Sequence, residues 1–111
     1  MADRSRNPGV IVVLVTCPSQ EVGEKIARAV VEERLAACVN VVSGLNSVYR
    51  WKGKVCQDPE SLLVIKTRRT KLPALSRRVK GLHPYSVPEV IALPVIAGSG
   101  PYLSWVRNST P

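Results

Sequence analysis

The stretch that most constrains the fold covers residues 39–67, where two runs rich in β-branched, aromatic and aliphatic residues flank Lys52-Gly53. This pattern predicts a β-hairpin, because glycine readily adopts the backbone conformation of a tight turn. With a two-residue turn and no bulge, Val41 is expected opposite Val64 and Val39 opposite Lys66. The first arm would span roughly 40 Å, about twice the usual strand. We therefore expect its overhanging end, at Trp51, to be covered.

The segment before the hairpin predicts one strand and one helix. Residues 10–16 form an apolar run without a charged side chain, which is typical of a strand in the middle of a sheet. Ser19 is a suitable N-cap for the helix that follows, and apolar residues then recur at helical spacing. This helix is expected to end near residues 35–37.

The segment after the hairpin repeats the order of helix and strand. Thr70 is the expected cap of a second helix, and Gly81 its expected C-terminal cap. Residues 83–96 predict a strand, but prolines interrupt it and restrict it to a sheet edge. Residues 98–101 break the chain before a short terminal helix.

The predicted order is strand, helix, strand, strand, helix, strand, with a terminal helix. Two apolar strands in the centre and two mixed strands at the edges indicate an α+β, ferredoxin-like (split βαβ) fold, with both helices on one face. We expect residues 1–9 to be a disordered tail and residues 10–111 to form a single domain.

Charge and cysteine content limit which partners and which cellular compartment are expected for this chain. The net charge is +8, and no acidic residue lies between Glu60 and Glu89. Such a field attracts polyanions nonspecifically, but a solvated helix face is the explanation that we favour. Three cysteines without a CxxC motif argue against a disulfide framework and favour reduced thiols. With no apolar run long enough to cross a membrane, we expect a soluble cytoplasmic protein.

His83, the single histidine, is the first candidate for chemistry, and Glu89 follows it six residues later. Imidazole and carboxylate can both bind a metal, but these two groups alone cannot complete a tetrahedral site. A histidine that packs or hydrogen-bonds at a helix end is the alternative. No nucleophile is paired with a base in a recognisable motif, so an enzyme is not expected.

A second candidate is an intersubunit interface or cleft. Tyr and Trp combine an apolar body with a polar group, and both are typical of such surfaces. Glu60 and Lys66 have even spacing on one predicted strand, where a simple ion pair is the alternative to a role in the cleft. The aromatic candidates for this surface are Tyr49, Trp51, Tyr85 and Trp105.

Five ordered sequence blocks together resemble the divalent-cation tolerance protein CutA family. They are LAACVNV (35–41), SVYRWKGK (47–54), ExxLVIKT (60–67), HPYSVPE (83–89) and YLSW (102–105). The resemblance spans residues 10–107. It implies a cytoplasmic, ferredoxin-like homotrimer that is non-catalytic and is involved in tolerance to divalent cations, notably copper.

The resemblance also implies a weak copper site. Of the family's proposed ligands, His83 matches, whereas Val15 and Leu82 stand where some members have cysteine and histidine. We expect the metal ligands to be His83, Glu89 and the thiolate of Cys17. A PII-like signalling trimer that binds small molecules in intersubunit clefts is the alternative function. A specific nucleic-acid module is disfavoured, because the predicted strand 61–67 carries no aromatic residue.

Overall fold

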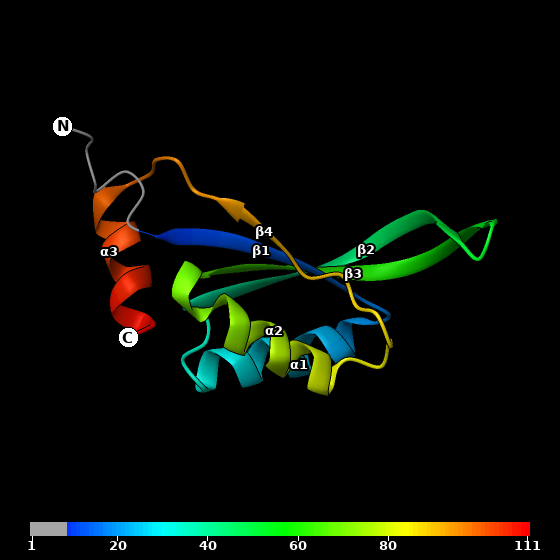
Figure 1. Ribbon diagram of the computed structural model, residues 1–111, viewed down its shortest axis with the longest axis horizontal. Coiled ribbons are helices and arrows are strands. Elements are labelled where there is room, and N and C mark those ends of the chain that lie inside the picture. Colours follow the sequence, from blue (N-terminus) through cyan, green and yellow to red (C-terminus); the bar gives the residue numbers. More distant parts are fainter. Residues whose placement is uncertain (1–8) are drawn as a thin grey trace.

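The computed structural model describes residues 9–111 and places three helices against a four-stranded sheet (Figure 1). A short 3₁₀ turn, Arg69–Lys71, precedes the second helix. The elements in chain order are β1 (Val10–Cys17), α1 (Gln20–Glu32), β2 (Cys38–Trp51), β3 (Lys54–Arg68), α2 (Leu72–Leu82), β4 (Ile91–Pro94) and α3 (Gly100–Ser109).

The sheet is antiparallel throughout, with the strand order β2-β3-β1-β4. The two central strands are β1 and β3, as the sequence predicts, and the fold is ferredoxin-like. Helices α1 and α2 lie on the same side of the sheet, whereas α3 lies at one end of it (Figure 1). The far end of the β2–β3 hairpin extends beyond both helices (Figure 1).

Alternating side chains of the central strands form the core with the two helices. From β1, Val13 and Val15 are fully buried, and from β3, Leu63 and Ile65. Each such side chain contributes roughly 1.5–3 kcal/mol by leaving water. The helix residues that pack onto this face are Ile26, Val30, Leu75 and Val79.

The hairpin register differs from the predicted one in its first half. From Trp51 to Leu45 the pairing follows a two-residue turn, but it shifts by one residue between Val42 and Leu45. Val41 therefore lies opposite Leu63, and Val39 opposite Ile65. The shift is a β-bulge in which Gly44 has a φ of 84°, a conformation that favours glycine. The bulge lets Val39 and Val41 pack against the core beneath α1.

Two helix boundaries also differ from the predicted ones. Helix α1 ends at Glu32 rather than near residues 35–37, because Arg34 takes a φ of 60° and the chain turns back. The amides of Leu35 and Ala36 both donate to Val30 O there. Thr70 does not cap α2, since it lies inside the 3₁₀ turn, and the helix continues through Gly81 to Leu82. The Ser19 side chain caps α1 as predicted.

The final strand is shorter than residues 83–96. Only Ile91–Pro94 pairs with β1, and residues 83–90 form a loop that leads from α2 to the sheet edge. Pro84 and Pro88 lack the amide hydrogen that a strand ladder needs, so pairing begins after them. The predicted tail, residues 1–9, lies outside the described residues except for Gly9. No helix within residues 9–111 is long and apolar enough to cross a membrane.

Candidate functional site

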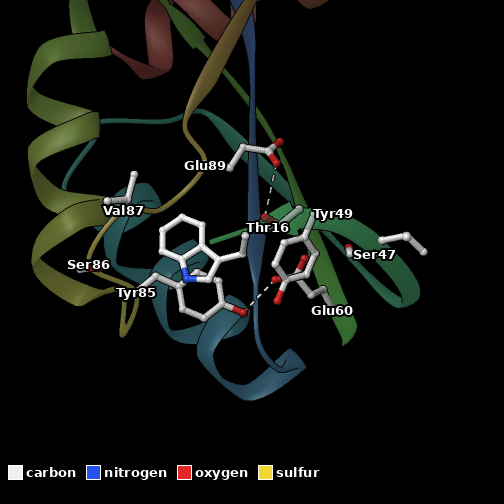
Figure 2. Close-up of a pocket in the computed structure, with 10 residues that line it drawn as sticks. Thr16, Ser47, Tyr49, Glu60, Tyr85, Ser86, Val87 and Glu89 are labelled. Carbon is white, nitrogen blue, oxygen red and sulfur yellow. Dashed lines mark hydrogen bonds between the residues drawn. The ribbon is translucent and has the colours of Figure 1, made fainter. Parts of the chain in front are cut away.

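A cleft of about 580 Å³ lies where the overhanging part of the β2–β3 hairpin meets the loop after α2 (Figure 2). The sheet supplies one wall and the loop supplies the other. The residues that line it are Thr16, Ser47, Val48, Tyr49, Trp51, Glu60, Tyr85, Ser86, Val87 and Glu89. Its lining thus combines three aromatic rings, two carboxylates and several hydroxyl groups.

The sheet wall is assembled by the bulge. Along β3, Glu60 has the opposite parity to the buried residues Leu63 and Ile65, so it points away from α1 and α2. Beyond the bulge, Leu45 pairs with Glu60, so the odd-numbered residues of β2 share its face. This places Ser47 and Tyr49 in the cleft. Thr16 completes this wall from the end of β1.

His83 anchors the loop wall to the sheet. Its ring is only 7% exposed, and Nε2 lies 2.7 Å from Thr16 O. A carbonyl oxygen can only accept, so Nε2 carries the proton, and Nδ1 accepts the Tyr85 amide at 3.1 Å. Both ring nitrogens are therefore occupied by backbone groups. The Tyr85 ring lies 4.7 Å from the imidazole, between centroids, and extends into the cleft.

Hydrogen bonds between side chains hold the aromatic groups in place. The Tyr85 hydroxyl donates to Glu60 Oε2 over 2.8 Å and so joins the two walls (Figure 2). The Tyr49 hydroxyl donates to Asp58 on the neighbouring strand. That bond, together with partial desolvation, raises the pKa of Tyr49 to about 12. Burial and the bond to Glu60 raise the pKa of Tyr85 as well, so both phenols stay neutral at physiological pH.

The two cleft carboxylates have no basic partner among the described residues. Within residues 9–111 the one ion pair joins Arg78 to Glu33, on the helical side of the sheet. The Glu89 carboxylate lies 3.5 Å from the Thr16 hydroxyl, and the one hydrogen bond that Glu60 accepts from residues 9–111 comes from Tyr85. Among residues 9–111, no lysine or arginine lines the cleft, although the chain carries a net charge of +8. The cleft is therefore suited to a positively charged occupant.

The three predicted metal ligands do not form a metal site in the described chain. Among residues 9–111, no three His, Cys, Asp or Glu side chains are close enough to hold a metal ion together. Cys17 is fully buried, and burial, with a smaller effect of Glu60, raises the pKa of its thiol to about 11. His83 has no free lone pair while its hydrogen bonds persist. Glu89 alone of the three lines the cleft.

Four of the six predicted cleft residues line the cleft, namely Tyr49, Trp51, Glu60 and Tyr85. Lys66 lies farther along β3 and donates to Asn40 instead of pairing with Glu60. Trp105 lies on α3, with its ring centroid 5.5 Å from that of Tyr102.

Sequence reasoning missed the polar residues Thr16 and Ser47 of the cleft. Thr16 is the one hydroxyl residue in the apolar run of residues 10–16, and that exception was a usable signal. Ser47 could be placed on the same face of the sheet as Glu60 only from the residue pairing between β2 and β3 near the turn.

Comparison with known proteins settles which family this architecture represents. A sequence model described as "CutA1 divalent ion tolerance protein" matches residues 11–109. The chain belongs to the CutA1 divalent ion tolerance protein family. It is 58% identical over 99 residues to the divalent-cation tolerance protein CutA of Thermus thermophilus, covering 89% of this chain and 96% of that protein.

Other CutA proteins extend the similarity to plants. The chloroplastic CutA of Arabidopsis thaliana is 53% identical over 110 residues, which is 99% of this chain but only 60% of that protein. The crystal structure of CutA1 from Oryza sativa superposes with a TM-score of 0.91 at 51% identity, covering 96% of this chain and 97% of that one. The CutA1 family name describes tolerance to divalent ions and specifies no catalysed reaction.

Proposed function

We propose that this chain forms a non-catalytic homotrimer that binds divalent cations, copper included, at the cleft and acts in the cytoplasm. The observation that supports cation binding most directly is the pair of cleft carboxylates, Glu60 and Glu89, without a basic partner in residues 9–111. Carboxylate oxygens are ligands for divalent cations, and the family is named for tolerance to such ions.

Copper is the preferred ion under this proposal, because it stands above zinc in the general affinity order for oxygen and nitrogen ligands. The affinity is modest. For His83 to bind copper through Nδ1, the bond from the Tyr85 amide must break, and for Cys17 to bind, a buried thiol must lose a proton. Glu89 and Glu60 are therefore the first ligands, and His83 and Cys17 join only with local rearrangement.

The proposed trimer is supported by two separate sets of exposed apolar side chains. One lies on the hairpin and includes Val48, Trp51 and Val55; the other lies on β4 and beyond and includes Leu93 and Ile96. Large exposed apolar residues in groups are typical of surfaces that contact another protein. Two different patches favour head-to-tail contacts between chains, and such contacts close into rings. The resemblance to the CutA family implies that the ring contains three chains.

The cytoplasmic setting is supported by the cysteines. Cys17, Cys38 and Cys56 are all free thiols in the structure, and free thiols persist in reducing compartments.

Isothermal titration of the whole protein with Cu²⁺ and Zn²⁺ tests the cation site. Glu60→Gln and Glu89→Gln should each weaken copper binding about tenfold, whereas Glu32→Gln, an exposed substitution on α1, should not. His83→Ala reports whether the imidazole joins the site. Wild-type affinity in both cleft variants would place the copper site elsewhere. Multi-angle light scattering of the same samples tests the trimer, and a monomeric mass would contradict it.

A PII-like role, in which the cleft binds a small molecule, is the second candidate function. The observation that favours it is the size of the cleft, because about 580 Å³ is far more than one ion needs and falls within the range of small-molecule sites. A ligand panel in the same titration distinguishes the two functions.

A further inference from the structure

The residues that line the cleft say more about the charge and shape of an organic ligand than the volume of the cleft does. Its aromatic residues are Tyr49, Trp51 and Tyr85, and its two charged residues are Glu60 and Glu89. Aromatic faces carry negative electrostatic potential, and together with carboxylates they are the groups that recognise ammonium ions. Neither an anion nor a neutral apolar molecule would use both sets of groups.

We infer that the cleft is a binding site for a small organic cation, such as a quaternary ammonium or a protonated amine. The inference rests on the second proposed function, a small molecule in the cleft, and adds the chemical class of that molecule. Three features of the site support this inference: its charge, its aromatic wall, and the hydrogen bonds of its two tyrosine hydroxyls.

The first feature is charge. Both cleft carboxylates lack a basic partner within residues 9–111, and each has at least one oxygen that accepts no hydrogen bond there. An uncompensated carboxylate beside an apolar wall attracts a cation strongly, because low-polarity surroundings screen charge less than water does. Glu60 enters from β3 and Glu89 from the loop before β4, so a ligand between them meets negative charge on two sides.

The second feature is the preorganised aromatic wall. Tyr85 is held at both ends: its amide donates to His83 Nδ1, and its hydroxyl donates to Glu60 Oε2. Tyr49 is fixed by its hydrogen bond to Asp58. Rings that are already positioned lose little conformational entropy on binding, so more of the cation–π attraction remains as affinity.

The third feature is the hydrogen bonding of the two tyrosine hydroxyls. Tyr49 donates its hydroxyl proton to Asp58 and Tyr85 donates its own to Glu60, so neither hydroxyl is free to donate to a ligand. A ligand that needs hydrogen-bond donors, as a phosphate or carboxylate does, finds none from these residues, whereas a cation needs none.

The test titrates the full-length oligomer with tetramethylammonium chloride, and with tert-butanol as a neutral molecule of similar size. Amide chemical shifts around Thr16, Tyr85 and Glu89 should move with tetramethylammonium, and tert-butanol should bind at least tenfold more weakly. Equal binding of the two probes would overturn the inference. So would a complete absence of shifts, the result expected if a segment of a neighbouring copy fills the cleft.

Variants separate this site from the proposed metal site. Glu60→Gln should weaken binding of both tetramethylammonium and Cu²⁺. Tyr49→Leu removes an aromatic ring of the cleft but no carboxylate, so it should weaken tetramethylammonium binding about fivefold and Cu²⁺ binding by less. Tyr85→Phe keeps the ring and should retain tetramethylammonium binding within about threefold. Tetramethylammonium affinity that is insensitive to Tyr49→Leu and Glu60→Gln would contradict a cation site here, even if copper binding follows the carboxylates.

Discussion

His83 Nε2 donates a hydrogen bond of 2.7 Å to the backbone carbonyl oxygen of Thr16, so the loop after α2 is fixed to the last residues of β1. The same ring accepts the Tyr85 amide. The buried His83 side chain thus links the backbone of one wall of the cleft to the backbone of the other. The position of Tyr85, and with it the shape of the cleft, depends on this bridge.

We expect His83→Ala to lower the free energy of unfolding by about 1–3 kcal/mol, because a partly buried carbonyl and a nearby amide lose their partners. Urea denaturation measures this loss. Tyr85→Phe is the matched control, since it removes only the exposed hydroxyl bond to Glu60 and should cost less. Faster hydrogen exchange at the Tyr85 amide should accompany the loss in His83→Ala. Unchanged stability would mean that the bridge contributes nothing to folding.

The stability of the protein should fall as pH rises above 9, in part because of Cys17. Burial raises the pKa of this thiol from 9.0 to about 11, so the unfolded chain releases the proton at lower pH than the folded chain. The contribution is fully present below pH 9 and is lost as pH rises through about 11. Urea unfolding between pH 8 and 11 should show a steeper decline for wild type than for Cys17→Ala. Parallel declines would exclude this role of Cys17.

Gly44→Ala should destabilise the fold by about 1–2 kcal/mol, because a φ of 84° is strained for any residue with a Cβ. Gly81→Ala is the matched control: it also has open space around its Cβ position, but it lies in α2, where alanine is favoured by up to about 1 kcal/mol. Thermal unfolding should therefore shift in opposite directions for the two variants. A neutral Gly44→Ala would show that the bulge tolerates a side chain.

Trp51→Ala should weaken assembly, because the indole is 51% exposed in the single chain and lies near the tip of the overhanging hairpin. The melting temperature should drop and become more dependent on protein concentration. Val31→Ala, at a similarly exposed apolar position on α1, should change neither property. An intact trimer with the wild-type melting temperature in Trp51→Ala would mean that Trp51 makes no contact between chains.

Strand order and core could be predicted from the sequence because both depend on which segments are continuously apolar. The runs at Val13 and Val15 and at Leu63 and Ile65 could occupy only central strands, and this determined the ferredoxin-like fold. The register before Gly44, from Cys38 to Val42, could not be predicted, since a bulge adds one residue without changing the alternating pattern by much. Proline positions explained the short β4, but the sequence did not show where pairing begins.

The site was predictable to the extent that it depends on residue type. Tyr49, Trp51 and Tyr85 were identified because Tyr and Trp are typical of interfaces and clefts, and Glu60 because of its even spacing from Lys66 on one strand. The local role of His83 was not fixed by its type, because a histidine before proline can bind a metal or bridge two backbone segments equally well. Only the positions of Thr16 O and the Tyr85 amide distinguish these roles.

The bulge at Gly44 divides β2 into two segments whose odd-numbered side chains lie on opposite faces of the sheet. Before it, Val39 and Val41 are committed to the interior; after it, Ser47 and Tyr49 meet the cleft with the same odd-numbered alternation. In a regular strand, all these residues would share one side of the sheet, and a change that suited the ligand would also disturb the packing. Here the two halves can vary independently. Chains with this architecture are therefore free to diversify what the cleft accepts while their interior stays the same.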